Sequence, residues 1–73
     1  MKLSLKAARI NANLTQKNIA KQLGVSEATV CRWEMGTYSI SLAYLNKYCE
    51  LCKIERSNID TDSIKIDESK EIE

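Results

Sequence analysis

The sequence has no histidine, no proline and no phenylalanine, and only two of its 73 residues are glycine. Histidine is the most frequent general base of enzymes and the commonest metal ligand, so its absence argues against catalysis and metal binding. Few glycines and no prolines favour helices over a turn-rich β fold. We therefore expect an all-α protein that is not an enzyme and that binds no cofactor, no metal and no small-molecule substrate.

Long apolar stretches are also absent. No segment approaches the ~20 apolar residues of a membrane span, and nothing resembles a signal peptide. Three cysteines, an odd number, do not suggest a secreted disulfide framework. We expect one small domain in the cytoplasm, without a membrane partner.

The net charge is only +1, but the charge is unevenly distributed. Residues 1–56 hold nine Lys or Arg and four acidic residues, a net charge of +5, whereas residues 57–73 hold two Lys and six acidic residues, a net charge of −4. The summed charge therefore conceals a basic body. We expect residues 61–73 to form an acidic, flexible tail. Within it, the alternation in Ile64-Lys65-Ile66 could form a short strand that pairs in a dimer.

Residues 15–36 have the pattern of two short helices joined by a three-residue turn. Thr15 and Ser26 are good helix N-caps, because a side-chain oxygen can accept an otherwise unpaired backbone N–H. Gly24 lies where the chain must take a positive φ, and Val25 is apolar enough to fill the angle between the helices. The apolar residues at helical spacing are Ile19, Ala20, Leu23, Val30 and Trp33. A helix-turn-helix of this spacing presents its second helix to the DNA major groove.

The remaining segments complete a compact bundle of four to five short helices. Helices are predicted over residues 5–12, 16–23, 27–35, 42–52 and 55–59. Asn13 follows the first helix, at a position where left-handed geometry often ends a helix, and Gly36 is placed to end the third. The predicted buried stripe of the fourth helix is Leu42, Leu45, Cys49 and Cys52. We assign residues 1–60 to one domain, with the helix-turn-helix at about 15–35.

These residues resemble the Cro/CI-type (XRE) helix-turn-helix domain of phage repressors and their bacterial relatives. The matching positions are Thr15-Gln16, Ile19-Ala20, Leu23-Gly24-Val25-Ser26, Val30, Trp33-Glu34 and Gly36, preceded by Leu5 to Leu14. The resemblance covers about residues 3–60. It implies a lambda-repressor-like fold and a sequence-specific transcription regulator of double-stranded DNA, most simply a repressor of phage or mobile-element type.

In this family the outer face of the second motif helix reads base edges. The matching positions here are Glu27, Ala28, Thr29 and Arg32. Arg32 can form a bidentate pair with guanine O6 and N7, and Glu27 can accept from cytosine N4. The methyl groups of Ala28 and Thr29 can contact a thymine methyl. Without the resemblance, the same face would be read as a solvated helix surface.

The family also holds a DNA phosphate at the start of the first motif helix, where Gln16 stands and where a helix N-terminus favours anions. Further candidate phosphate contacts are Thr15, Lys17, Ser26, Thr37, Tyr38 and Ser39. Ordinary capping or solvation is the alternative for each. Relatives often have Asn before the glycine at 36 and Lys or Arg after it, but this chain has Met35, Thr37 and Tyr38. We therefore expect weak non-specific binding and a shallow salt dependence.

The resemblance further implies a partly buried ion pair between Arg9 and Glu34. Such a pair would fix the second motif helix against the first helix of the domain. Removing one partner would then be worse than removing both, because a buried charge would be left unpaired.

Cys49-Glu-Leu-Cys52 has the spacing of a zinc or redox motif. Zinc would need two further ligands, and the chain offers only Cys31 besides. A thioredoxin-like role would need a βαβ setting. We interpret Cys49 and Cys52 as small core residues. Cys31 is predicted to be exposed, where its oxidation could switch DNA binding.

Tight specific binding normally needs two copies of so small a module on a palindromic site. We expect a homodimer, at least on DNA, with contacts from Tyr44, Tyr48 and Ile59 or from the tail. The alternative function is a protein-interaction module, such as an antitoxin-like regulator in which DNA binding is secondary. The low net charge favours this alternative, and the face that carries Arg32 opposes it.

Overall fold

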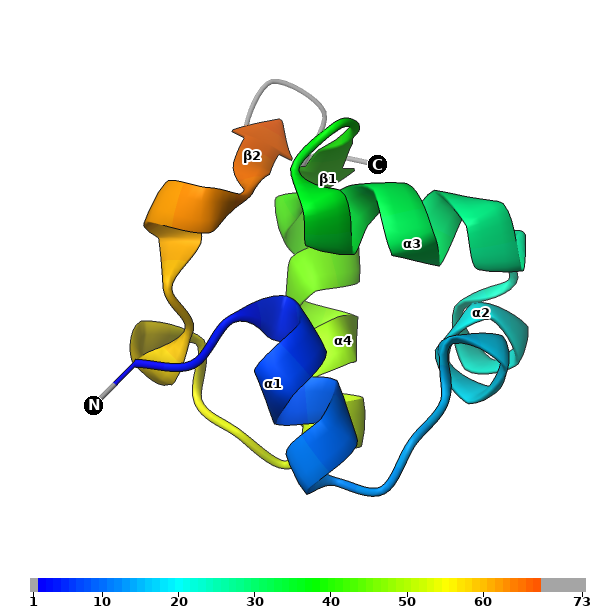
Figure 1. Cartoon of the computed structure of the whole chain (residues 1–73), viewed down its shortest axis with the longest axis horizontal. Helices are drawn as coiled ribbons and strands as arrows, with labels where there is room; N and C mark the ends of the chain where they lie inside the picture. The colour runs from blue at the N-terminus through cyan, green and yellow to red at the C-terminus, as the bar shows by residue number, and fades with distance from the viewer. Residues whose placement is uncertain (1, 68–73) are drawn as a thin grey trace.

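The computed structural model describes residues 2–67, in which four α-helices form the body of the protein (Figure 1). The helices are α1 (Leu5–Asn11), α2 (Gln16–Leu23), α3 (Glu27–Met35) and α4 (Leu42–Cys52). Figure 1 shows α3 lying across the view, α2 seen nearly end-on beside it, and α1 in front of α4. The predicted all-α class is confirmed. None of the helices in residues 2–67 is long and apolar enough to cross a membrane.

Side-chain caps begin every α-helix of the described chain. The capping oxygens belong to Ser4, Thr15, Ser26 and Ser41, and they accept from the amides of Ala7, Asn18, Thr29 and Tyr44. Gly24 and Gly36 have φ angles of 73° and 78°, so both helices of the motif end in left-handed geometry. Asn13 also has a positive φ, of 60°. The predicted bounds of α2, α3 and α4 are confirmed, and α1 ends at Asn11, one residue before the predicted end.

The core lies where the four helices meet. Its buried side chains include Leu5, Ala8, Ile19, Ala20, Val30, Trp33, Leu45, Tyr48, Cys49 and Cys52. Val30 and Trp33 are the inner residues of α3, as the helical wheel predicted. The ring of Trp33 packs against that of Tyr44, with the ring centroids 5.3 Å apart. Val25 in the turn is partly buried against the same core. The inner face of α3 is therefore fully used in folding, which leaves its outer face for contacts with other molecules.

A two-stranded parallel sheet is added to the helices. Strand β1 (Ser39–Ser41) pairs with strand β2 (Lys65–Asp67), and Ile40 lies opposite Ile66 in the register. Part of the segment predicted as a flexible tail, residues 61–73, is thus regular structure, because residues 65–67 form β2. The alternation at 64–66 does mark a strand, but the strand pairs within its own chain. The rest of the predicted tail, residues 68–73, lies outside the described residues.

The predicted fifth helix, over residues 55–59, is only one short 3-10 turn, η1 (Arg56–Asn58), and a second, η2 (Thr61–Ser63), follows it. Backbone hydrogen bonds join this segment to the N-terminus, from the Leu3 amide to the Asn58 carbonyl (2.8 Å) and from the Asp60 amide to the Leu3 carbonyl (2.7 Å). Ile59, beside them, is buried. Short-range sequence periodicity carries no signal for these contacts, because they join segments that are far apart in the chain.

Candidate nucleic-acid interface

The outer face of α3 carries the predicted base-reading residues. Glu27, Ala28 and Arg32 are exposed, and Thr29 is half-buried. The hydroxyl of Thr29 lies 2.8 Å from that of Ser26, which also caps the Thr29 amide. Thr29 and Ser26 therefore already have hydrogen-bond partners within the protein, and the methyl group of Thr29 is the part best suited to a base contact.

Glu34 fixes α3 from behind, because its carboxylate accepts hydrogen bonds from three other helices. From α1, Arg9 donates through Nε to Oε2 (2.7 Å) and through Nη2 to Oε1 (3.2 Å). From α2, Gln16 donates through Nε2 to Oε1 (3.0 Å), and from α4 the Tyr48 hydroxyl lies 2.6 Å from Oε2. The side chains of Arg9 and Glu34 are only 10% and 3% exposed. The predicted ion pair between them is confirmed, and it belongs to a larger junction that we call the Glu34 junction (Arg9, Gln16, Glu34 and Tyr48).

The junction also places the turn between α1 and α2. Arg9 Nη1 donates to the carbonyl oxygen of Leu14 (3.0 Å), just before the Thr15 cap of α2. Arg9 thus connects α1, the turn into α2, and α3 at once. One buried guanidinium therefore helps to hold the two helices of the motif in place.

Gln16 was predicted as a phosphate contact, and its side chain is engaged inside the protein. An amide NH₂ has two donor hydrogens, and the bond to Glu34 uses one of them. This bond does not use the second hydrogen, whereas the Asn18 amide in the first turn of α2 already donates to the Thr15 hydroxyl. The bond to Glu34 fixes the position of the Gln16 side chain, and the phosphate contact at this residue stays a prediction.

The junction shifts the ionisation of its members. Burial alone would raise the pKa of Glu34, but the hydrogen bonds from Arg9, Tyr48 and Gln16 outweigh burial and hold the pKa below its ordinary value of 4.5. The hydrogen bond to Glu34 raises the pKa of Arg9, and burial together with the neighbouring carboxylate raises the pKa of Tyr48. At neutral pH the junction consequently holds an ionised Glu34, an ionised Arg9 and a neutral Tyr48.

Acid should therefore destabilise the protein through Glu34. Its pKa is lower in the folded than in the unfolded state, so its contribution to stability is complete above pH 4.5 and is lost as the pH falls below that value toward the folded-state pKa. We expect the free energy of unfolding, measured by urea titration with Trp33 fluorescence, to decrease on acidification in this range. A Glu34→Gln variant should show a smaller decrease between neutral pH and pH 3, and an equal decrease would contradict this assignment.

The loop after α3 differs from the prediction in one respect. Thr37, Tyr38 and Ser39 are exposed as expected for phosphate neighbours, and so are Thr15 and Lys17 at the other end of the motif. No sequence pattern indicated, however, that the Tyr38 ring would lie under the guanidinium of Arg32, with Arg32 Cζ 5.0 Å from the ring centroid. A cation and an aromatic ring six residues apart have no helical relation, so only the turn at Gly36 brings them together.

Two of the three cysteines lie in the core. Cys49 and Cys52 are buried, as predicted, and burial raises the pKa of both thiols, that of Cys52 to about 11, which disfavours the reactive thiolate. Within residues 2–67 no three His, Cys, Asp or Glu side chains are grouped to hold a metal ion. Cys31 was expected to be exposed, but it is half-buried, with Sγ 3.7 Å from Met35 Sδ.

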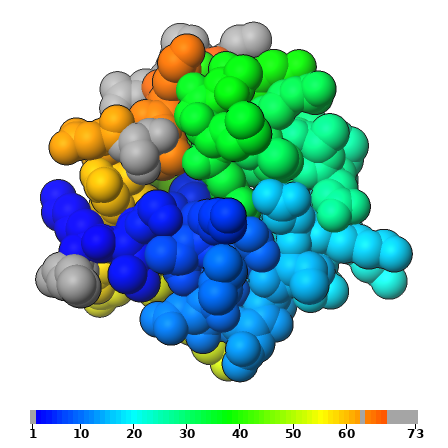
Figure 2. All heavy atoms as spheres, viewed as in Figure 1, coloured from blue at the N-terminus to red at the C-terminus, as the bar shows by residue number. Residues whose placement is uncertain are grey.

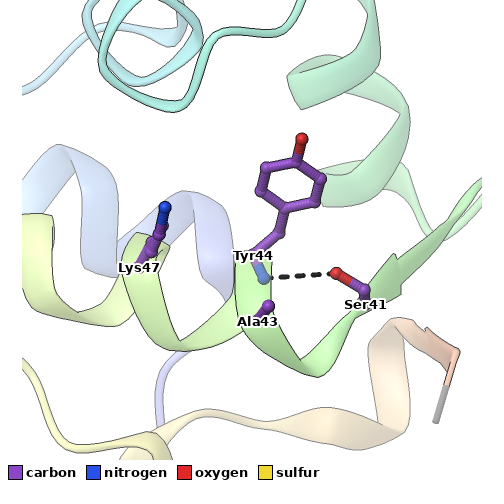
Figure 3. A pocket seen from close by; sticks show the side chains of 4 residues that line it. All are labelled: Ser41, Ala43, Tyr44 and Lys47. Atoms are coloured by element: carbon purple, nitrogen blue, oxygen red, sulfur yellow. Dashed lines mark hydrogen bonds between the residues drawn. The ribbon is translucent and has the colours of Figure 1, made fainter. Parts of the chain in front are cut away.

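A pocket opens at the start of α4, lined by Ser41, Ala43, Tyr44 and Lys47 (Figure 3). The Ser41 hydroxyl is already used to cap the Tyr44 amide, and Tyr44 extends from α4 toward α3.

Helix α3 thus has a buried inner face, a junction that fixes its position, and an outer face with exposed Glu27, Ala28 and Arg32. Figure 2 shows the packed α1, α2 and α3 segments side by side on one face of the molecule, in blue, cyan and green. This fold and this face define a helix-turn-helix DNA-binding domain.

The comparisons with known proteins agree with this class. The model of the family described as helix-turn-helix matches residues 5–58. An uncharacterized HTH-type transcriptional regulator of Methanocaldococcus jannaschii is 39% identical over 59 residues, which are 81% of this chain and 89% of the relative. No solved structure matches the chain. The protein belongs to the Cro/CI-type helix-turn-helix family, which makes it a DNA-binding protein of the transcriptional-regulator class.

Proposed function

We propose that this protein is a sequence-specific repressor, of the phage or mobile-element type, that inserts α3 into the major groove of a palindromic operator. The observation that carries the proposal is the division of α3 into two faces. Val30 and Trp33 are buried and Glu34 is locked by three helices, whereas Glu27 and Arg32 have no place in the core. A helix fixed in this way can present donors and acceptors to base edges at defined positions.

Specificity on this proposal comes from a few side chains. Arg32 pairs with a guanine, Glu27 accepts from a cytosine, and Ala28 and the Thr29 methyl contact a thymine methyl. Gln16 and the first amides of α2 hold a phosphate. The remaining predicted phosphate contacts are Thr15, Lys17, Ser26, Thr37, Tyr38 and Ser39.

We further propose that the protein binds its operator as a homodimer, because one module of this size buries too little surface for tight specific binding. The structure corrects the predicted contacts. Tyr48 and Ile59 are 0% and 1% exposed, so they stabilise the monomer and cannot lie in a dimer interface. Of the three residues named from the sequence, only Tyr44 keeps an accessible side chain.

Selection from a pool of random duplexes tests the proposal. We expect enrichment of one palindrome whose half-sites lie about one helical turn apart, since each protomer would place α3 in a successive major groove. The salt dependence of binding should be shallow, because the loop after α3 lacks a lysine or arginine at 37–39. If no sequence is enriched and Arg32→Ala binds every duplex as the unaltered protein does, the alternative of a protein-interaction module is correct.

A further inference from the structure

We propose that Tyr38 is a positioning residue for Arg32: its ring holds the guanidinium in the orientation in which Arg32 reads a guanine. The inference rests on the proposed function of α3 and adds a residue that reads no base itself. It starts from the placement of Arg32 over the Tyr38 ring, with 5.0 Å between Cζ and the ring centroid.

The backbone brings the two side chains together. Gly36 ends α3 with a φ of 78°, which reverses the chain so that the next residues return along the helix. The amides of Thr37 and Tyr38 both donate to the carbonyl oxygen of Arg32, at 3.0 and 3.3 Å. Arg32 is therefore held by the same loop at both ends, at its carbonyl by two amides and at its guanidinium by the ring.

Stacking leaves the guanidinium free to read a base. The ring attracts the flat face of the guanidinium, whereas bidentate pairing with guanine O6 and N7 uses the N–H donors at its edge. Both interactions can form at once. Because an arginine side chain loses much rotamer freedom on binding, a ring that already restricts it lowers the entropic cost of reading the base.

Tyr38 has no evident role in stability. Its side chain is 46% exposed, and it does not belong to the buried core or to the partly buried side chains packed against it. Removing the ring should therefore leave the fold intact. The hydroxyl could still contact a phosphate, as predicted from the sequence, so the ring and the hydroxyl have to be tested separately.

The test compares Tyr38→Leu, which removes the ring, with Tyr38→Phe, which removes only the hydroxyl. Binding is measured on the selected operator and on the same duplex with the Arg32-contacted guanine replaced. We expect Tyr38→Leu to weaken operator binding by about two- to fivefold per half-site, the range of an exposed cation–π pair, and so by about four- to 25-fold for a dimer on two half-sites. It should leave binding to the altered duplex unchanged and have no effect in an Arg32→Ala background. Tyr38→Phe should retain the discrimination between the two duplexes.

An equal loss on both duplexes, or a loss that persists without Arg32, would overturn the proposal, because the ring would then contact only the DNA backbone. A measurement without DNA separates this failure from that of the proposed function. In the free protein the Arg32 δ protons should be shifted upfield by the ring current, and the shift should vanish in Tyr38→Leu and remain in Tyr38→Phe. Absence of the shift would overturn the positioning role even if an operator is found. If the Arg32 δ protons are shifted but the protein selects no duplex, Arg32 does not read a base. The proposed role of Tyr38 in base reading is then refuted as well.

Discussion

Replacing Glu34 by Gln is expected to lower the free energy of unfolding by about 3–5 kcal/mol, the cost of breaking a buried ion pair on one side. The two oxygens of Glu34 accept from Arg9, Gln16 and Tyr48. A Gln side chain offers one acceptor oxygen and an NH₂ group. At least one donor of the junction would then face another donor, and Arg9 would keep a buried charge without a counter-ion.

This loss is large for so small a domain. At roughly 0.05–0.15 kcal/mol per residue, 73 residues give a total stability of roughly 4–11 kcal/mol. The variant should be largely unfolded at the low end of that range and show a much lower urea midpoint at the high end. Trp33, the single tryptophan and 4% exposed, reports the transition by fluorescence.

Two further variants make the prediction sharp. The double variant Arg9→Met/Glu34→Gln should lose less stability than the sum of the two single losses, because no buried charge remains unpaired. Glu50→Gln removes a carboxylate from the exposed side of α4 and serves as the matched control, with an expected change within about 0.5 kcal/mol. If Glu34→Gln lowers the free energy of unfolding no more than Glu50→Gln does, the Glu34 junction does not make the predicted contribution to stability.

Replacing Arg32 by Ala is expected to abolish most of the discrimination between the operator and unrelated DNA. A bidentate arginine–guanine pair contributes about 1–3 kcal/mol of discrimination, and a dimer on two half-sites would lose roughly twice that amount. Arg32 is exposed on α3, where its guanidinium contacts the ring of the exposed Tyr38, so the fold should survive the change. Circular dichroism and urea unfolding would verify that it does.

Arg56→Ala is the charge-matched control for Arg32→Ala. Arg56 is exposed on η1 and donates to Asn46 of α4 (3.3 Å), away from the outer face of α3. Both variants lose one positive charge, but only Arg32→Ala should lose sequence preference, in competition binding with operator and scrambled duplexes. Equal behaviour of the two variants would reduce the contribution of Arg32 to a general electrostatic one.

The helices could be predicted from the sequence because their signals are local. A Ser or Thr cap, a helical repeat of apolar residues and a glycine at the end lie within ten residues of one another, and the helices that start after Thr15, Ser26 and Ser41 have their predicted bounds. The confirmed ion pair is a different case. Arg9 and Glu34 are 25 residues apart, and only the resemblance to a known family connected them.

The same local logic failed where partners are distant. A strand of three residues carries almost no periodic signal. Strand β2 reaches β1 only because α4 and the 3-10 turns after it form the connection between the two parallel strands. Tyr48 was wrongly predicted to lie in a dimer interface. The sequence of a helix does not indicate whether the hydroxyl of a tyrosine will have a buried acceptor from another helix. In the structure that acceptor is Glu34, supplied by another helix.

The sequence by itself determined the four α-helices, the bounds of α2, α3 and α4, and which face of α3 is apolar, since these follow from caps, glycines and spacing within single segments. Only the tertiary structure decided how the helices are joined at Glu34, which tyrosine is buried, and that Tyr38 supports Arg32. The physical reason is that a hydrogen bond or a ring contact depends on positions in space. Residues from different segments come within its few ångströms only after the core has packed.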